Sequence, residues 1–87
     1  MKQWFVYILR CSDGTLYTGS TDDVQRRLQV HNSGKGSKYT RSRTPVEVVY
    51  SEEVESHSAA LKREYAIKQL TRQQKIKLIE DNKCPVP

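Results

Sequence analysis

The sequence predicts an α+β domain in which a three-stranded antiparallel sheet is flanked by helices, in the order ββαβαα. Two runs rich in β-branched and aromatic residues flank a Ser-Asp-Gly turn near the N-terminus. A third such run follows a basic loop, and apolar residues recur with helical spacing between and after these runs. A sheet backed by helices is the economical way to bury all of these faces together.

The first two strands are expected at Trp4–Arg10 and Thr15–Ser20, where β-branched and aromatic residues are frequent. The loop between them has two possible lengths. The commonest hairpin would centre a two-residue turn on Asp13-Gly14. A longer hairpin would use the three residues from Ser12 to Gly14, with the glycine in the left-handed conformation.

The loop length decides whether two tyrosines share a face of the sheet. The two-residue turn would pair Arg10 with Tyr17 and would place Tyr7 and Tyr17 on opposite faces. The three-residue loop pairs Leu9 with Tyr17 and Tyr7 with Gly19, so the tyrosines become diagonal neighbours within reach of one small group. We predict the three-residue loop, because only this parity brings the two phenols together.

The first helix is expected to begin at Thr21-Asp22-Asp23 and to run to about Asn32. Thr21 can accept a hydrogen bond from a free backbone N–H group, and the two aspartates would face the positive end of the helix dipole.

Within this helix Val24 and Leu28 set the buried stripe. Arg27 and His31 then lie along its edge, whereas Arg26 points nearly opposite. Arg27 and His31 are separated by four residues and are therefore neighbours that could grip a phosphate. The alternative is that both belong to a solvated border of the helix.

The segment from Ser33 to Pro45 is expected to be an irregular loop, because it contains two glycines and closes on a proline. Its cations surround one aromatic ring, a mixture that suits a nucleic-acid backbone. Charge runs are more often simply solvated. The candidate nucleic-acid-binding residues are Lys35, Lys38, Tyr39, Arg41 and Arg43.

The third strand is expected at Val46–Val54, and helical spacing follows from about His57 to Leu70. The sequence Thr71 to Gln74 is a capping box that begins a last helix through Glu80.

Glu64 is expected to project from the middle of an apolar helix face, where a carboxylate needs a partner. One possible partner is Lys68, four residues further on. The other is a divalent metal ion, since Mg²⁺ is often held by only one or two carboxylates together with water and substrate phosphate oxygens. The apolar residues on the two sides of Glu64 are Ala60 with Ile67 and Leu61 with Tyr65.

The composition is that of a small basic protein. Its 87 residues fit one domain, expected at 1–82 with a C-terminal tail at 83–87, and the net charge of +5 favours a polyanionic partner. No apolar run is long enough to span a bilayer and no signal peptide is evident, so a cytoplasmic protein without membrane attachment is expected. Cys11 and Cys84 are expected to be free thiols, and the lack of a Cys/His cluster argues against structural zinc.

Taken together, "VYI" (6–8), "YTG" (17–19), "RRLQVH" (26–31) and the helical Glu64 resemble the GIY-YIG nuclease family over nearly the whole chain. The stretch from 31 to 50 looks most like the small stand-alone bacterial members and also resembles the nuclease module of structure-specific repair enzymes. Val6 and Ile8 beside Tyr7, and Thr18 after Tyr17, depart from the motifs in the family name. Neither departure removes a reactive group.

The resemblance implies a metal-dependent endonuclease that hydrolyses phosphodiester bonds, with DNA as the expected substrate and Mg²⁺ or Mn²⁺ as cofactor. By motif position the implied catalytic residues are Tyr7, Tyr17, Arg27, His31 and Glu64, with Glu64 as the metal ligand. The phenols would orient water and phosphate, and the metal and Arg27 would favour phenolate. The chain has no additional DNA-binding module, which leaves room for a protein partner that supplies substrate choice. A nucleic-acid-binding or adaptor module without turnover remains the alternative.

Overall fold

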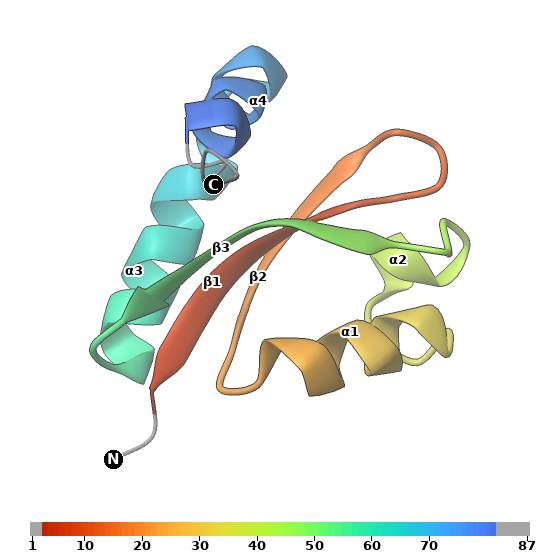
Figure 1. The fold of residues 1–87 in the computed structure, drawn as a ribbon, viewed down its shortest axis with the longest axis horizontal. Helices are drawn as coiled ribbons and strands as arrows, with labels where there is room; N and C mark the ends of the chain where they lie inside the picture. Colours follow the sequence, from red (N-terminus) through yellow and green to blue (C-terminus); the bar gives the residue numbers. More distant parts are fainter. Residues whose placement is uncertain (1–2, 82–87) are drawn as a thin grey trace, which may run out of the picture.

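The computed structural model describes residues 3–81, in which a three-stranded antiparallel sheet of strand order β2-β1-β3 lies between helices (Figure 1). The fold class is therefore as predicted, with one additional short helix. The elements are β1 Trp4–Arg10, β2 Leu16–Thr21, α1 Val24–Asn32, α2 Lys38–Arg41, β3 Glu47–Val54, α3 His57–Lys68 and α4 Arg72–Asp81.

The hairpin between β1 and β2 has the predicted three-residue loop. Tyr7 pairs with Gly19 and Leu9 pairs with Tyr17, so both tyrosines lie on one face of the sheet. Gly14 closes the turn with φ +85°, a left-handed conformation that glycine adopts without steric cost.

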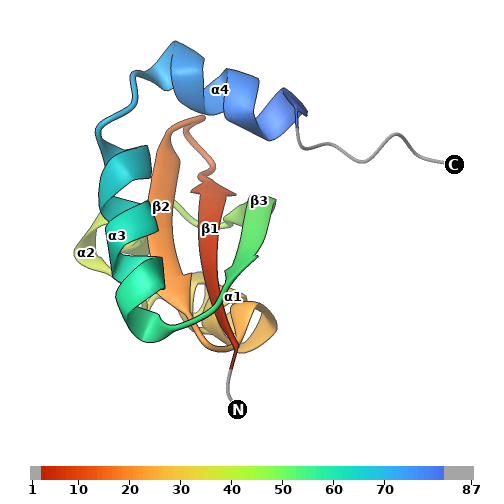
Figure 2. The same ribbon diagram turned by 90° about the vertical axis from the view of Figure 1, so that its left-hand side faces the viewer.

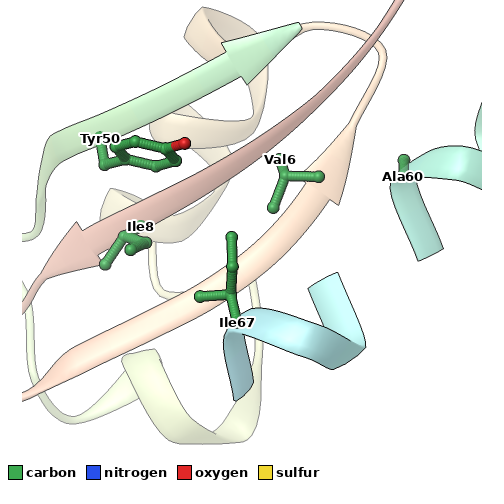
Figure 3. Packing of buried hydrophobic residues seen from close by; sticks show 5 residues of the cluster. All are labelled: Val6, Ile8, Tyr50, Ala60 and Ile67. Atoms are coloured by element: carbon green, nitrogen blue, oxygen red, sulfur yellow. The ribbon is translucent and has the colours of Figure 1, made fainter. Parts of the chain in front are cut away.

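Two hydrophobic cores form, one on each face of the sheet. Val6 and Ile8 in β1 pack with Tyr50 of β3 against Ala60 and Ile67 of α3 (Figure 3). The alternate residues of β1, Tyr7 and Leu9, face the other way, where α1 lies. As the central strand, β1 is buried on both faces, which explains its unbroken run of apolar residues.

The helices approach the sheet from opposite sides. In Figure 1 the sheet lies between α3 on one side and α1 with α2 on the other. Figure 2 shows α4 crossing beyond the hairpin end of the sheet. None of the helices within residues 3–81 has the length and apolar character that a membrane crossing requires.

The start of the first helix differs from the prediction. Asp23 is the N-cap of α1, and its side chain accepts a hydrogen bond from the Arg26 backbone N–H at 3.1 Å. Thr21 instead belongs to β2, and its hydroxyl accepts from the Asp23 backbone N–H at 3.1 Å. The hydroxyl of Thr21 therefore shapes the turn before the helix rather than capping it.

The basic loop is not wholly irregular, in contrast to the prediction. Ser37 caps the one-turn helix α2, and its side chain and that of Thr40 satisfy each other's backbone N–H groups in a capping box. The predicted capping box at Thr71 and Gln74 is also present and precedes α4. The predicted tail at 83–87, with Cys84, lies outside the described residues, and Cys11 is a buried free thiol.

The apolar face of α3 is only half buried. Ala60 and Ile67 are fully buried, whereas Leu61 is 51% exposed and Tyr65 is 68% exposed. Glu64 was predicted at the middle of this apolar face, and the structure buries only the Ala60 and Ile67 side of it. Glu64 lies at the border between the buried and the exposed side of α3, because β2 ends the sheet there.

Candidate active site

A cavity of about 320 Å³ lies at the edge strand β2, where side chains from both faces of the sheet meet. Tyr7, Tyr17 and Arg27 reach it from the α1 face, and Glu64 reaches it from α3 on the opposite face. Four of the five predicted catalytic residues therefore line one cavity. The fifth, His31, does not line it.

The Tyr7 ring can lie close against β2 because Gly19 has no side chain. A Cβ atom at Gly19 would lie 2.6 Å from the Tyr7 hydroxyl oxygen and 3.2 Å from a Tyr17 ring carbon. Only glycine permits this approach of the Tyr7 ring to β2.

His31 lies behind the tyrosines and is fully buried. Its Nε2 is 3.1 Å from the Tyr7 hydroxyl oxygen and its Nδ1 is 2.8 Å from Thr40 Oγ1. His31 was predicted at the edge of the apolar stripe, where it could grip a phosphate together with Arg27. This placement is wrong, because the His31 side chain is fully buried. The α2 turn covers the ring instead, and a Cβ atom at Gly36 would lie 2.2 Å from His31 Nδ1.

Burial has the largest effect on the pKa values of Tyr7 and His31. It raises the pKa of Tyr7 to about 12, although hydrogen bonding and charge from the Arg27 guanidinium act in the opposite direction. Burial also lowers the pKa of His31, and the Arg27 charge adds to this effect. The expectation that Arg27 favours the Tyr7 phenolate holds in direction, but burial outweighs it in the protein alone.

The Glu64 carboxylate has two partners within the protein. Its Oε1 accepts a hydrogen bond from the Ser20 hydroxyl at 2.7 Å, and its Oε2 is 2.7 Å from Lys68 Nζ. The Glu64 side chain is 19% exposed. The Lys68 partner considered from the sequence is therefore present, and the Ser20 hydroxyl adds a second contact across the edge of β2.

The donor set suits a hard cation held partly by its substrate. Within residues 3–81 no cluster of three or more His, Cys, Asp or Glu side chains could hold a metal ion alone. Glu64 nevertheless brings a carboxylate to the cavity, and the Ser20 hydroxyl oxygen lies beside it. Mg²⁺ commonly accepts one or two carboxylates when water and phosphate complete its coordination, so these residues fit such an ion.

The candidate nucleic-acid-binding residues fall into two groups. Tyr39 is 38% exposed, and its ring centroid is 5.9 Å from that of Tyr17. Arg43 covers the Tyr39 ring at 4.2 Å and donates to Asp13 Oδ2 at 2.9 Å. Arg43 therefore also fixes the loop, whereas three cations lie exposed and form no ion pair among residues 3–81: Lys35, Lys38 and Arg41.

Sequence reasoning did not identify Ser20, Thr40 or Gly36 as part of the site. Ser20 adjoins the "YTG" motif, so its position beside a cavity residue was the available signal. Thr40 and Gly36 carried no such signal, because their role depends on α2 folding over His31.

Comparison with known proteins finds a matching family model and several relatives of similar sequence. The family model described as GIY-YIG catalytic domain matches residues 3–77. A UPF0213 protein of Staphylococcus epidermidis is 57% identical over 81 residues, covering 93% of this chain and 99% of its own length. A UPF0213 protein of Staphylococcus aureus is 56% identical with the same coverage.

Solved structures agree with the fold. The solution NMR structure of a UPF0213 protein from Bacillus halodurans has a TM-score of 0.62 and 44% identity, covering 95% of this chain and 88% of that chain. The solution NMR structure of a protein from E. faecalis has a TM-score of 0.59 and 43% identity, covering 90% and 84% of the respective chains.

Proposed function

Because the chain belongs to the GIY-YIG catalytic domain family, a nuclease family, we propose that it is a metal-dependent endonuclease hydrolysing phosphodiester bonds in DNA. The observation that carries this proposal is the gathering of Tyr7, Tyr17, Arg27 and Glu64 on one open cavity at the edge of β2. A phenol pair, a guanidinium and a carboxylate are the groups that an in-line attack of water on a phosphodiester can use.

Arg27 is assigned to the scissile phosphate, because a guanidinium matches phosphate oxygens in charge and shape. Tyr7 and Tyr17 are assigned to the attacking water. As the water oxygen bonds to phosphorus, Tyr7 accepts a proton of the water, and the departing oxygen leaves with the electrons of the broken bond and takes up a proton from solvent. The charge of Arg27 stabilises the negative charge that grows on the phosphoryl oxygens.

For Tyr7 to accept that proton, it must first release its own, and His31 Nε2 lies 3.1 Å from the hydroxyl oxygen as an acceptor. Because burial raises the pKa of Tyr7 and lowers the pKa of His31, this transfer would depend on additional positive charge at the phenol, which a bound cation would supply. Thr40 Oγ1 is 3.3 Å from the Ser37 carbonyl oxygen, to which it donates. It can then accept the Nδ1–H of His31, which leaves Nε2 as the acceptor for the Tyr7 hydroxyl proton. We therefore assign His31 to proton transfer and Thr40 to fixing its tautomer.

Glu64, assisted by Ser20, is the residue assigned to hold Mg²⁺ or Mn²⁺. Such a cation would supply the positive charge that lowers the pKa of nearby water and phenol and neutralises charge on the phosphate. In binding it, the Glu64 carboxylate would exchange Lys68 for the cation. We propose that the substrates are DNA structures that arise in repair. We further propose that the protein acts in the cytoplasm and that a protein partner contributes to the choice of substrate.

A binding or adaptor module without turnover is the second candidate. The observation in its favour is the ion pair between Glu64 and Lys68, which gives the carboxylate a partner without any metal ion. The two candidates differ in whether Glu64 is needed for cleavage.

The test is the Glu64→Gln variant, which keeps the shape of the side chain and removes its charge. We expect metal-dependent cleavage to fall by several orders of magnitude, with thermal stability and metal-free DNA binding nearly unchanged. Cleavage is measured on labelled single-stranded, duplex and branched DNA with Mg²⁺, Mn²⁺ or chelator. Glu53→Gln, which removes the same charge from an exposed position on β3, is the matched control. Full activity in the Glu64→Gln variant would rule out the assignment.

A further inference from the structure

A second cavity, of about 190 Å³, lies further along the same edge strand. It is lined by Thr15 just before β2, by Leu16 at the start of β2, by Tyr39 of α2, and by Arg72 and Lys75 of α4. Like the candidate active site, it brings together helices from opposite faces of the sheet. None of the functions assigned above uses Arg72 or Lys75.

Two aromatic rings connect the cavities. Tyr17 lines the first cavity, Tyr39 lines the second, and their ring centroids are 5.9 Å apart. Arg43 lies over the Tyr39 ring and holds it in this position. The Tyr17 and Tyr39 rings therefore form an aromatic wall between the two cavities, beside the edge of β2.

The charge of the second cavity is positive. Among residues 3–81 neither Arg72 nor Lys75 forms an ion pair, whereas the arginines of β1 and α3, Arg10 and Arg63, are each paired with a glutamate. Two cations that form no ion pair among residues 3–81 and lie beside an aromatic wall suit a phosphate backbone better than an apolar or cationic ligand.

The spacing suits a continuous strand. From Leu16 to Gly19 or Ser20 an extended chain covers roughly 10 to 13 Å. A strand of a few nucleotides can span this length, because successive phosphates of one strand are further apart than their axial spacing of about 3.4 Å. A substrate bound at the first cavity can therefore reach the second without a sharp bend.

We propose that the DNA strand bound at the candidate active site continues along the edge of β2 to a second subsite, the α4 subsite, formed by Arg72 and Lys75. This inference rests on the proposed function for the identity of the ligand. The α4 subsite binds phosphates a few nucleotides from the reacting one and makes no contact with the reacting atoms.

The test compares two double variants of equal charge change. Arg72→Gln with Lys75→Gln removes the α4 subsite, and Lys62→Gln with Lys77→Gln removes two exposed cations of α3 and α4 that do not line it. Binding of a labelled DNA duplex is measured without metal across a salt series. We expect the slope of log affinity against log salt to fall by about two for the first variant and to change little for the second.

Equal duplex slopes in the two variants would overturn the α4 subsite. Cleavage of the duplex with Mg²⁺ or Mn²⁺ is measured separately. A protein that binds with the expected slopes but never cleaves would contradict the proposed nuclease activity and would leave the α4 subsite supported.

Discussion

At the scale of single residues, the position of the Tyr7 hydroxyl depends on neighbours that have no reactive group. Gly19 and Gly36 leave the space that Tyr7 and His31 occupy, since a Cβ atom at either glycine would collide with those side chains. Thr40 holds the far nitrogen of His31 at 2.8 Å. The chemistry of the cavity is therefore sensitive to substitutions that alter no charge.

Gly19→Ala tests this steric requirement. The added methyl group would lie 2.6 Å from the Tyr7 hydroxyl oxygen, so Tyr7 must shift from its contact with His31. We expect a loss of about 1 to 3 kcal/mol in unfolding free energy, typical of overpacking, and a fall in cleavage. Denaturant unfolding and the cleavage assay measure the two effects. Wild-type values in both would show that the site tolerates a side chain at this position.

The buried His31 predicts a pH dependence of stability. Its pKa in the folded protein lies below the value of about 6.5 that an exposed histidine has, so the unfolded chain binds the proton more readily. The contribution of neutral His31 to stability is therefore complete above about pH 6.5 and is lost as pH falls through the lowered pKa of the folded state.

The measurement is the thermal unfolding midpoint of the wild type and of His31→Gln across this pH range. The variant is less stable overall, but the part of the acid destabilisation that belongs to His31 disappears from it. Parallel curves for the two proteins would contradict the assignment.

At the scale of elements, the basic segment around α2 contains one cation that makes structural contacts and three that are exposed and unpaired among residues 3–81. Arg43 donates to Asp13 and to the Tyr39 carbonyl oxygen, which ties the loop to the hairpin. Lys35, Lys38 and Arg41 are exposed and have no such role. The two groups should therefore respond differently to substitution.

Replacing Lys35, Lys38 and Arg41 together by Ala should lower the salt slope of DNA binding by about three if each contacts one phosphate, with stability unchanged. Arg43→Ala should instead reduce stability by about 1 kcal/mol, because it removes partly exposed hydrogen bonds and an ion pair. Binding titrations over a salt series and thermal melts separate these effects. An unaltered slope in the triple variant would make the loop a solvated connector.

At the scale of the whole molecule, β1 joins the two cores. Its odd and even residues pack on opposite faces, so neither core can form without the strand that the other requires. The cavity at β2 likewise depends on both faces, because Tyr7 and Tyr17 lie on one face of the sheet and Glu64 reaches the cavity from the other.

We expect Ile8→Ala and Leu9→Ala, one from each core, to lower the unfolding free energy by about 2 to 5 kcal/mol each. Both variants should unfold in a single transition, as small domains usually do. Fluorescence of Trp4, the single tryptophan, and circular dichroism report the transition independently. Separate transitions by the two probes would show that the cores fold independently.

Local rules applied to the sequence were enough to predict the class of fold, the three-residue hairpin loop and the shared face of Tyr7 and Tyr17. These rules are the two-residue period of strands, the parity of a short loop and the capping chemistry at Thr71. The same rules missed the cap at Asp23 and the α2 turn, because several polar side chains there could satisfy the same backbone groups.

The surroundings of the reactive groups, in contrast, depend on tertiary packing. His31 meets Tyr7 across 24 residues of sequence and Glu64 meets Ser20 across 44, and both contacts depend on how α1 and α3 pack on opposite faces of the sheet. Helical periodicity showed which side of each helix is apolar but not where the sheet ends. Because β2 is an edge strand, the face of α3 that continues past it is exposed, and Glu64 can reach around that edge into a cavity formed by the other face.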